Sequence, residues 1–206
     1  GTEHQITVTI HGADEIVSNT PAVIGGNDSG AVTEDRAVDA DGRLNATGQL
    51  SVSDADSGES AFDTASVSAA DGTLGQLSLT ADGQWTYQVA NAAVQFLKAG
   101  ETRDEVFTVR SLDGTEHQVT VTITGVNDAA AIAGNDTGAV TEDRAVDADG
   151  RLNAAGQLSV SDADSGEAAF DTASVSAADG TLGQLTLAAD GQWTYQVANA
   201  AVQFLK

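Results

Sequence analysis

The chain has 206 residues, of which 31 are acidic and 8 basic, so its formal net charge is −23 at pH 7. That charge excludes binding to nucleic acid through phosphate contacts and binding to an anionic membrane surface. No apolar run approaches the roughly 20 residues that cross a bilayer, so we expect no membrane insertion in this segment. Cysteine is absent, which does not by itself assign a compartment.

One stretch of the sequence occurs twice. Residues 134–206 repeat residues 26–98 at a distance of 108 positions, with five differences that all exchange small residues. Residues 1–10 (GTEHQITVTI) likewise match residues 114–123 at all positions but one. A long fixed period is typical of an array of folded modules. We therefore divide the chain into residues 1–21, the last strand of a preceding module with a linker, residues 22–126, a complete module, and residues 127–206, a second and incomplete module.

Alternation of apolar and polar residues predicts the strands in chain order. Residues 2–10 form the first strand, and residues 11–25 a linker that is five residues longer than its counterpart before the second module. In the first module, strands are expected over residues 31–33, 49–53, 62–68, 74–80 and 84–89. The last two form a hairpin around Asp82-Gly83, because this dipeptide supplies the positive φ that such turns need. Trp85, Tyr87 and Val89 share one face, with Trp85 as the expected core anchor.

Residues 91–97 interrupt the alternation. We expect a single helical turn capped by Asn91, with Val94, Phe96 and Leu97 facing inward. A second hairpin follows, with strands over residues 105–111 and 116–124. This pattern of short strands and turns predicts an all-β fold of tandem immunoglobulin/cadherin-like antiparallel β-sandwich modules. The second module lacks the counterpart of residues 99–125, so it should not close a sandwich alone.

Acidic residues gather in loops that recur in both modules. The loop Asp54-Ala-Asp-Ser-Gly-Glu59 presents carboxylates at alternate positions and returns as residues 162–167. Alternating carboxylates before a glycine suit Ca²⁺, which takes about six to eight oxygen ligands. Further acidic and amide pairs, such as Glu34-Asp35, open or close a module, and in a head-to-tail array such ends meet at the linker.

We therefore predict Ca²⁺ sites at the module ends. The expected ligands are Asp28, Glu34, Asp54, Asp56, Asn127, Asp128, Asn135, Asp136, Glu142, Asp162 and Asp164. Of these we expect Asn127, Asp128, Asn135, Asp136, Glu142, Asp162 and Asp164 to converge at the junction between the modules. The alternative is that these residues are ordinary turn formers and helix caps. We interpret most of the acids that precede or neighbour a glycine in this second way, namely Asp39, Asp41, Asp71, Asp82 and Asp113.

Four segments, residues 26–59, 71–89, 96–109 and 120–130, resemble a known family. With them the chain is similar, over essentially its whole length, to the VCBS repeats, the cadherin-like modules of giant bacterial surface proteins. The resemblance implies Ca²⁺-rigidified extender repeats of a type I-secreted, RTX-like adhesin, extracellular on the bacterial surface and used in cell adhesion and biofilms. It also implies metal ligands at Glu34, Asp54, Asp56 and the Asn127–Asp128 linker. The chain departs from the family in its first linker, where Ala13-Asp14 replaces that Asn-Asp pair.

Functions other than that of an extender make different demands on the sequence. We expect no enzyme, because the three histidines assemble no Ser-His-Asp or His-Cys set. A carbohydrate-binding module would need Trp85 and Trp193 on an exposed face. A self-assembling extracellular filament is a further alternative, in which residues 1–10 complete the truncated module of another copy by strand exchange. The expected partners are otherwise neighbouring copies of the same module.

Overall fold

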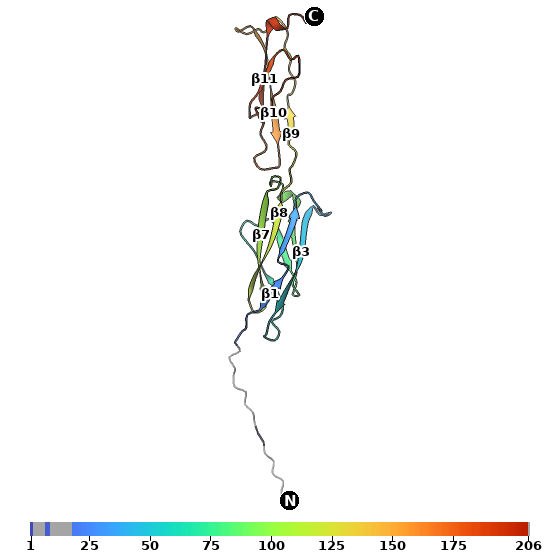
Figure 1. Cartoon of the computed structure of the whole chain (residues 1–206), viewed down its shortest axis with the longest axis vertical. Coiled ribbons are helices and arrows are strands. Elements are labelled where there is room, and N and C mark those ends of the chain that lie inside the picture. Colours follow the sequence, from blue (N-terminus) through green and yellow to red (C-terminus); the bar gives the residue numbers. More distant parts are fainter. Residues whose placement is uncertain (2–6, 9–17, 206) are drawn as a thin grey trace.

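A computed structural model describes residues 1, 7–8 and 18–205 of the chain. The strand expected over residues 2–10 and most of the segment 1–21 therefore lie outside the described residues. Two groups of strands follow one another along the long axis, residues 22–126 and then residues 127–205, here called the first and second modules (Figure 1). The all-β prediction is confirmed, and the helical elements among residues 18–205 are two short 3-10 turns. Within the described residues, every helix is too short to cross a membrane.

In the first module, eight strands form two four-stranded sheets. One sheet has the order β1-β3-β6-β5 and comprises β1 (Val23–Gly26), β3 (Arg43–Ser53), β6 (Gln84–Ala90) and β5 (Gln76–Leu79). The other has the order β2-β8-β7-β4 and comprises β2 (Ser29–Thr33), β8 (Glu116–Thr124), β7 (Thr102–Ser111) and β4 (Phe62–Ala69). Strands β2 and β8 run parallel, whereas the other neighbours are antiparallel. The apolar faces of the two sheets form one core.

Trp85 anchors that core, as predicted. Its side chain is fully buried, and its indole N–H donates to the carbonyl of Asn27 over 2.7 Å. The ring lies against Gly48 on the neighbouring strand, where an added Cβ would come within 2.4 Å of the indole. Any other residue at position 48 would therefore displace the ring.

A few local predictions are wrong. Strand β1 lies largely within the predicted linker, because its sequence Val-Ile-Gly-Gly shows no alternation that would indicate a strand. The turn η1 (Asn91–Ala93) has no side-chain cap, since the side chain of Asn91 bonds to Asp35 instead. Val94 and Leu97 are buried as expected, but Phe96 is 39% exposed.

The second module consists of one sheet. Its order is β11-β12-β10-β9, formed by β11 (Gln184–Leu187), β12 (Gln192–Ala198), β10 (Arg151–Ser161) and β9 (Ala131–Gly134), and the turn η2 (Asn199–Ala201) follows. The register repeats that of the first sheet in the first module. Residues 137–141 and 170–177 form no strand, because their partners in the first module are β8 and β7, which have no counterpart in residues 127–205. This module is therefore a half-sandwich in the chain.

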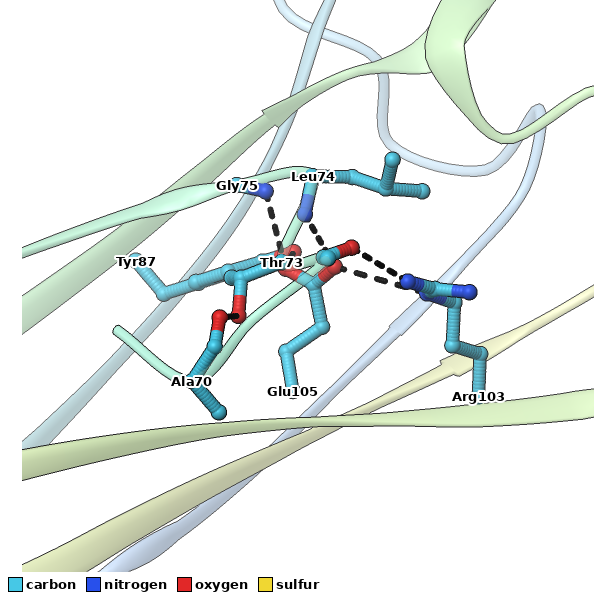
Figure 2. Close-up of polar contacts among 8 residues, drawn as sticks. Ala70, Thr73, Leu74, Gly75, Tyr87, Arg103 and Glu105 are labelled. Atoms are coloured by element: carbon cyan, nitrogen blue, oxygen red, sulfur yellow. Dashed lines mark hydrogen bonds and ion pairs between the residues drawn. The ribbon is translucent and has the colours of Figure 1, made fainter.

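A buried carboxylate joins the two sheets of the first module (Figure 2). Glu105 on β7 is 1% exposed and accepts hydrogen bonds from the Tyr87 hydroxyl at 2.6 Å and from the N–H groups of Leu74 and Gly75 at 2.5 and 2.8 Å. Arg103 lies 3.6 Å from the same carboxylate. Burial and the hydrogen bond to Glu105 raise the pKa of Tyr87. The network satisfies a charge that would otherwise be costly to bury.

Candidate metal centre

Glu34 stands at the end of the first module. It follows β2, and its N–H donates to the carbonyl of Thr124 at the end of β8 over 2.9 Å. The side chain is fully buried, and its carboxylate accepts hydrogen bonds from Gln95 Nε2 at 2.6 Å and from the Val126 N–H at 2.9 Å. A glutamate is thereby fixed beneath the start of the linker.

Asp35 lies beside Glu34 in a backbone conformation that is rare for a residue other than glycine, with φ of 56°. Asn91 holds it there from both sides, since Asn91 Oδ1 accepts the Asp35 N–H at 2.9 Å and Asn91 Nδ2 donates to Asp35 Oδ1 at 2.6 Å. Gln95 donates to the same oxygen at 3.1 Å. The second module repeats the arrangement at Asp143, with φ of 58° and the same bonds to Asn199.

The linker and the second module supply further carboxylates. The Asp128 N–H donates to Asp164 Oδ2 over 3.0 Å, and the Asp164 N–H donates to Asp162 Oδ1 over 2.9 Å. Asp164 is 2% exposed although it lies in a loop. Asn127, the remaining linker residue of the predicted set, is exposed and its side-chain amide bonds to the carbonyl of Asp128.

These carboxylates are close enough to perturb one another. Burial raises the pKa of Glu34, and the charges of Asp128, Asp35 and Asp164 raise it further against the lowering effect of the Val126 hydrogen bond. Burial likewise raises the pKa of Asp128, together with the charges of Asp35, Asp164 and Asp162. The junction is thus a concentration of negative charge drawn from both modules and the linker.

The environment of two carboxylate oxygens shows whether a cation would fit at the junction. Asp164 Oδ1 and Asp128 Oδ2 are buried and have no hydrogen-bond partner among the described residues. An unpaired buried carboxylate oxygen is costly, and hard oxygen ligands are what Ca²⁺ requires. The residues present therefore fit Ca²⁺ in chemical type and burial. Among residues 18–205, no three carboxylate oxygens of the junction lie within 4.8 Å of one another.

Direct contacts also join the two modules here. The Ser165 N–H donates to the carbonyl of Phe96 over 3.0 Å, and Lys98 Nζ lies 3.8 Å from a Glu167 oxygen. The ion pair is largely solvent-exposed, so it contributes at most about 1 kcal/mol. These contacts position the Asp162–Asp164 loop but leave the negative charge uncompensated.

The opposite end of the first module carries the counterpart of that loop. Asp54, Asp56 and Glu59 each present a carboxylate oxygen, and these oxygens lie within 4.8 Å of one another. Asp54 Oδ2 and Glu59 Oε2 are buried without a hydrogen-bond partner among the described residues. Burial and the charges of Asp54, Asp56 and Asp113 raise the pKa of Glu59.

The first linker is aligned differently from our prediction. The Thr20 N–H donates to Asp56 Oδ2 over 2.6 Å, just as the Asp128 N–H donates to Asp164. Asn19-Thr20 therefore corresponds to Asn127-Asp128, and the proposed counterpart Ala13-Asp14 is wrong. Ala13 and Asp14 lie outside the described residues. The first linker thus carries a threonine where the second carries an aspartate.

The predicted convergence of Asn135, Asp136 and Glu142 with Asp162 and Asp164 is wrong. Strand β9 pairs Ala131 with Ser161 and Gly134 with Leu158, so Asn135 lies about 13 Å along the strand from the junction. Its carbonyl accepts the indole N–H of Trp193 at 2.6 Å. Glu142 is the counterpart of Glu34 and lies at the far end of the second module, since its neighbour Asp143 bonds to Asn199 beside η2.

Asp28 is also separate from the junction. It precedes β2, whereas Glu34 follows it, and six strand residues span about 20 Å. Its carboxylate lies 3.1 Å from His117 Nε2. Of the predicted set, the junction therefore brings together Glu34, Asp128, Asp162 and Asp164, with Asp35 added. Gln95, which holds both Glu34 and Asp35, had no signal in the sequence.

The tryptophans do not form an exposed platform. Trp85 is 0% exposed and Trp193 is 5% exposed. A sugar-binding surface needs accessible aromatic faces, so the carbohydrate alternative loses its main support.

The turn interpretation of the remaining acids agrees with the hydrogen bonds of two of them. Asp39 accepts the N–H groups of Asp41 and Arg43, and Asp113 accepts those of Thr115 and Ala22.

Comparison with known families agrees with this organisation. Residues 19–125 and residues 127–204 each match the bacterial cadherin-like domain. The chain belongs to this family. No curated protein matches it.

Several solved structures are similar to the chain at low identity. The EC1–4 fragment of PcdhgB3 is 13% identical, with a TM-score of 0.43 over 89% of this chain and 42% of that one. A 1.5-MDa bacterial ice-binding adhesin is 14% identical, with a TM-score of 0.30 over 90% and 56%. A Ca²⁺-stabilised adhesin of an Antarctic bacterium is 17% identical, with a TM-score of 0.27 over 90% and 42%. The chain thus spans about half of these structures, and at such TM-scores they say nothing of its function.

Proposed function

We propose that this bacterial cadherin-like chain is a non-catalytic extender of a large extracellular adhesin, and that Ca²⁺ bound at the junction holds its two modules in line. The observation that carries the proposal is the buried carboxylate oxygen of Asp164 at the contact between the modules, which has no hydrogen-bond partner in the described part of the chain. The division into residues 22–126 and 127–206, the VCBS assignment, type I secretion and a role in biofilms belong to the same proposal.

The carboxylates that would bind Ca²⁺ come from three parts of the chain. Glu34 and Asp35 present carboxylates from the first module, Asp128 from the linker, and Asp162 and Asp164 from the second module. Asn91 and Gln95 fix the first pair by hydrogen bonds. The Asp128 N–H fixes Asp164. Bound Ca²⁺ would supply the positive charge that offsets repulsion among these groups, and metal binding would then stabilise the fold.

The near-identity of the two modules supports an extender. An extender needs only length and stiffness, which repetition supplies, whereas a catalytic or recognition site is needed once. The end-to-end arrangement of the modules (Figure 1) supports the same role, because each added module lengthens the array. The loop Asp54–Glu59 at the opposite end offers a second half-site for a preceding module.

A thermal melt in EDTA, in millimolar Ca²⁺ and in millimolar Mg²⁺ tests the proposal. We expect a rise in Tm that is specific for Ca²⁺, because irregular, partly buried oxygen ligands suit Ca²⁺ better than the strict octahedron of Mg²⁺. An equal rise in Tm with both ions would mean charge screening alone. No rise in Tm with either ion would contradict Ca²⁺ binding at the junction.

A further inference from the structure

Three asparagines of the chain stand two positions before a serine or a threonine. The motif Asn-X-Ser/Thr, in which X is not proline, is the acceptor of N-linked sugars in secreted proteins. It occurs at Asn27 (Asn-Asp-Ser), Asn45 (Asn-Ala-Thr) and Asn135 (Asn-Asp-Thr). A motif this short also arises by chance, so the surroundings of each asparagine decide which of the three can accept a sugar.

Asn27 and Asn135 present free amide groups in equivalent loops. Asn27 lies between β1 and β2, Asn135 directly follows β9, and both are exposed. In each residue Oδ1 accepts the N–H group two positions on, from Ser29 at 3.2 Å and from Thr137 at 3.3 Å. This arrangement is an Asx turn. The nitrogen Nδ2, which would carry the sugar, has no hydrogen-bond partner among residues 18–205 in either case.

Asn45 has the motif but not a free amide. It lies within β3, where Nδ2 donates to Asp39 Oδ2 over 2.7 Å and Oδ1 accepts Gln88 Nε2 at 2.8 Å. A sugar on Nδ2 would have to break the bond to Asp39 and stand between two strands. We therefore expect no transfer to Asn45 in the folded chain.

The differences between the two modules agree with this distinction. Ser29 is replaced by Thr137, which keeps the hydroxyl group and so keeps the motif. Thr47 is replaced by Ala155, which removes the motif at the counterpart of Asn45. The hydrogen bonds of Asn45 are nevertheless repeated at Asn153. The repeated feature is thus the motif in the first case and the hydrogen-bond network in the second.

The backbone fixes Asn27 on the flank of the first module. Its carbonyl accepts the indole N–H of Trp85, and its own N–H donates to the carbonyl of Gln49 over 2.8 Å. Beside the loop lies an open hollow of about 480 Å³, lined by Asp28, Ser29, Thr108, His117, Gln118 and Thr120 among others. Hydroxyl, amide and carboxylate groups of this kind can hydrogen-bond to the hydroxyl groups of a sugar.

We propose that Asn27 and Asn135 are acceptor sites for an N-linked hexose, one in each module. In the transfer, a bond forms between Nδ2 and C1 of a nucleoside-diphosphate sugar, while the bond from C1 to the phosphate oxygen breaks. The nucleoside diphosphate leaves with the electron pair, and the proton lost by Nδ2 passes to a base of the separate transferase. Asn27 and Glu34 flank opposite ends of β2, so the sugar does not approach the junction. The added sugar makes the flank bulkier and more soluble.

Peptide mapping of the chain made by the bacterium that encodes it tests the proposal. Trypsin places the three asparagines on different peptides, residues 1–36, 44–98 and 111–144. We expect hexose on the first and third peptides and none on the second, with the modified residue located by fragmentation in the mass spectrometer. Unmodified first and third peptides would overturn the proposal.

Transfer in vitro separates the acceptor from its surroundings. The purified, folded chain is incubated with a soluble bacterial asparagine glucosyltransferase and uridine diphosphate glucose. Asn27→Gln should lower the mass gain by one hexose, and it keeps the backbone carbonyl that binds Trp85. Ser29→Ala should do the same although it retains the acceptor, whereas Thr47→Ala, the matched control, should change nothing.

Transfer to Asn45 in place of Asn27 would contradict the selection of sites by their hydrogen bonds. Equal transfer to the unmodified chain and to Ser29→Ala would contradict the role of the motif. These measurements record mass and need no Ca²⁺, so their failure is distinct from failure of the proposed metal site.

Discussion

The N–H of Asp128 donates to the carboxylate of Asp164 over 3.0 Å, and this hydrogen bond links the connecting segment to the loop of the second module. The other oxygen of Asp164 is buried without a partner among the described residues. A carboxylate is thus held by one oxygen and left with the other available for a cation. Its counterpart Asp56 accepts the Thr20 N–H in the same way.

Asp164→Asn should remove most of the Ca²⁺-dependent rise in Tm. The amide keeps an acceptor oxygen for Asp128 but removes a charge from the cluster. In EDTA the same variant should be at least as stable as the unmodified chain, because repulsion with Asp128 and Glu34 is reduced. Calorimetric Ca²⁺ titration and melts check both expectations. Asp179→Asn, an exposed turn residue of the same module, makes the same charge change away from the junction and should leave Ca²⁺ binding intact.

The metal-free junction should become more stable on acidification. The pKa of Glu34 is raised above 4.5 and that of Asp128 above 3.8, so the folded state binds these protons more tightly than the unfolded state. Protonation of Glu34 and Asp128 therefore stabilises the folded state fully at pH values below the ordinary pKa values of 4.5 and 3.8. This stabilisation is lost as the pH rises through the raised pKa values of the folded state. Asp39 and Asp147 have lowered pKa values, so their ionised carboxylates stabilise the folded state at neutral pH. This stabilisation is lost only when the pH falls below 3.8, the ordinary pKa of an aspartate.

Calcium should reverse this dependence. Protons compete with the metal for the same carboxylates, so the gain in Tm on adding Ca²⁺ should shrink as the pH falls from neutral toward 4.5. Melts with and without Ca²⁺ at a series of pH values measure this difference. A Ca²⁺ increment that stays constant over the range would show that Glu34 and Asp128 do not contact the metal.

Much of the first module could be predicted from sequence. Trp85, Tyr87 and Val89 alternate on one strand, and Asp82-Gly83 and Asp113-Gly114 mark the two hairpin turns, so local rules suffice there. Strand β1 and the parallel pairing of β2 with β8 could not be found locally, because both depend on partners distant in the sequence. The role of Glu105 could not be found locally either, since only the packing of the two sheets brings Tyr87 to it.

Part of the candidate site could be predicted from the sequence. The wrongly placed ligands share one cause. Linear proximity suggested that Asn135, Asp136 and Glu142 join Asp128, but each strand residue advances the chain about 3.3 Å. The chain therefore carries Glu142 to the opposite end of the module. Glu34 reaches the junction for the same reason, although 94 positions separate it from Asp128. Asn91 was predicted as a helix cap and instead holds Asp35.

Tyr87→Phe should destabilise the first module by about 1–3 kcal/mol. The variant removes the 2.6 Å hydrogen bond that the Tyr87 hydroxyl donates to the buried carboxylate of Glu105. A hydrogen bond to a charged group contributes about that amount. Tyr195→Phe provides the matched control, because the residues that follow Tyr195 in the chain contain no counterpart of Glu105. It should cost a few tenths of a kcal/mol at most in denaturant unfolding followed for each module. Equal losses for both variants would contradict the assigned role of Glu105.

The most direct test of the account is the spread of distances between the two modules. The chain has no cysteine, so Gln76→Cys and Gln184→Cys, exposed equivalent positions on β5 and β11, can carry a single pair of spin labels. Pulsed electron resonance should give one narrow distance distribution in Ca²⁺ and a markedly broader one in EDTA, with Mg²⁺ resembling EDTA. Distributions of equal width in all three conditions would contradict a junction stiffened by calcium.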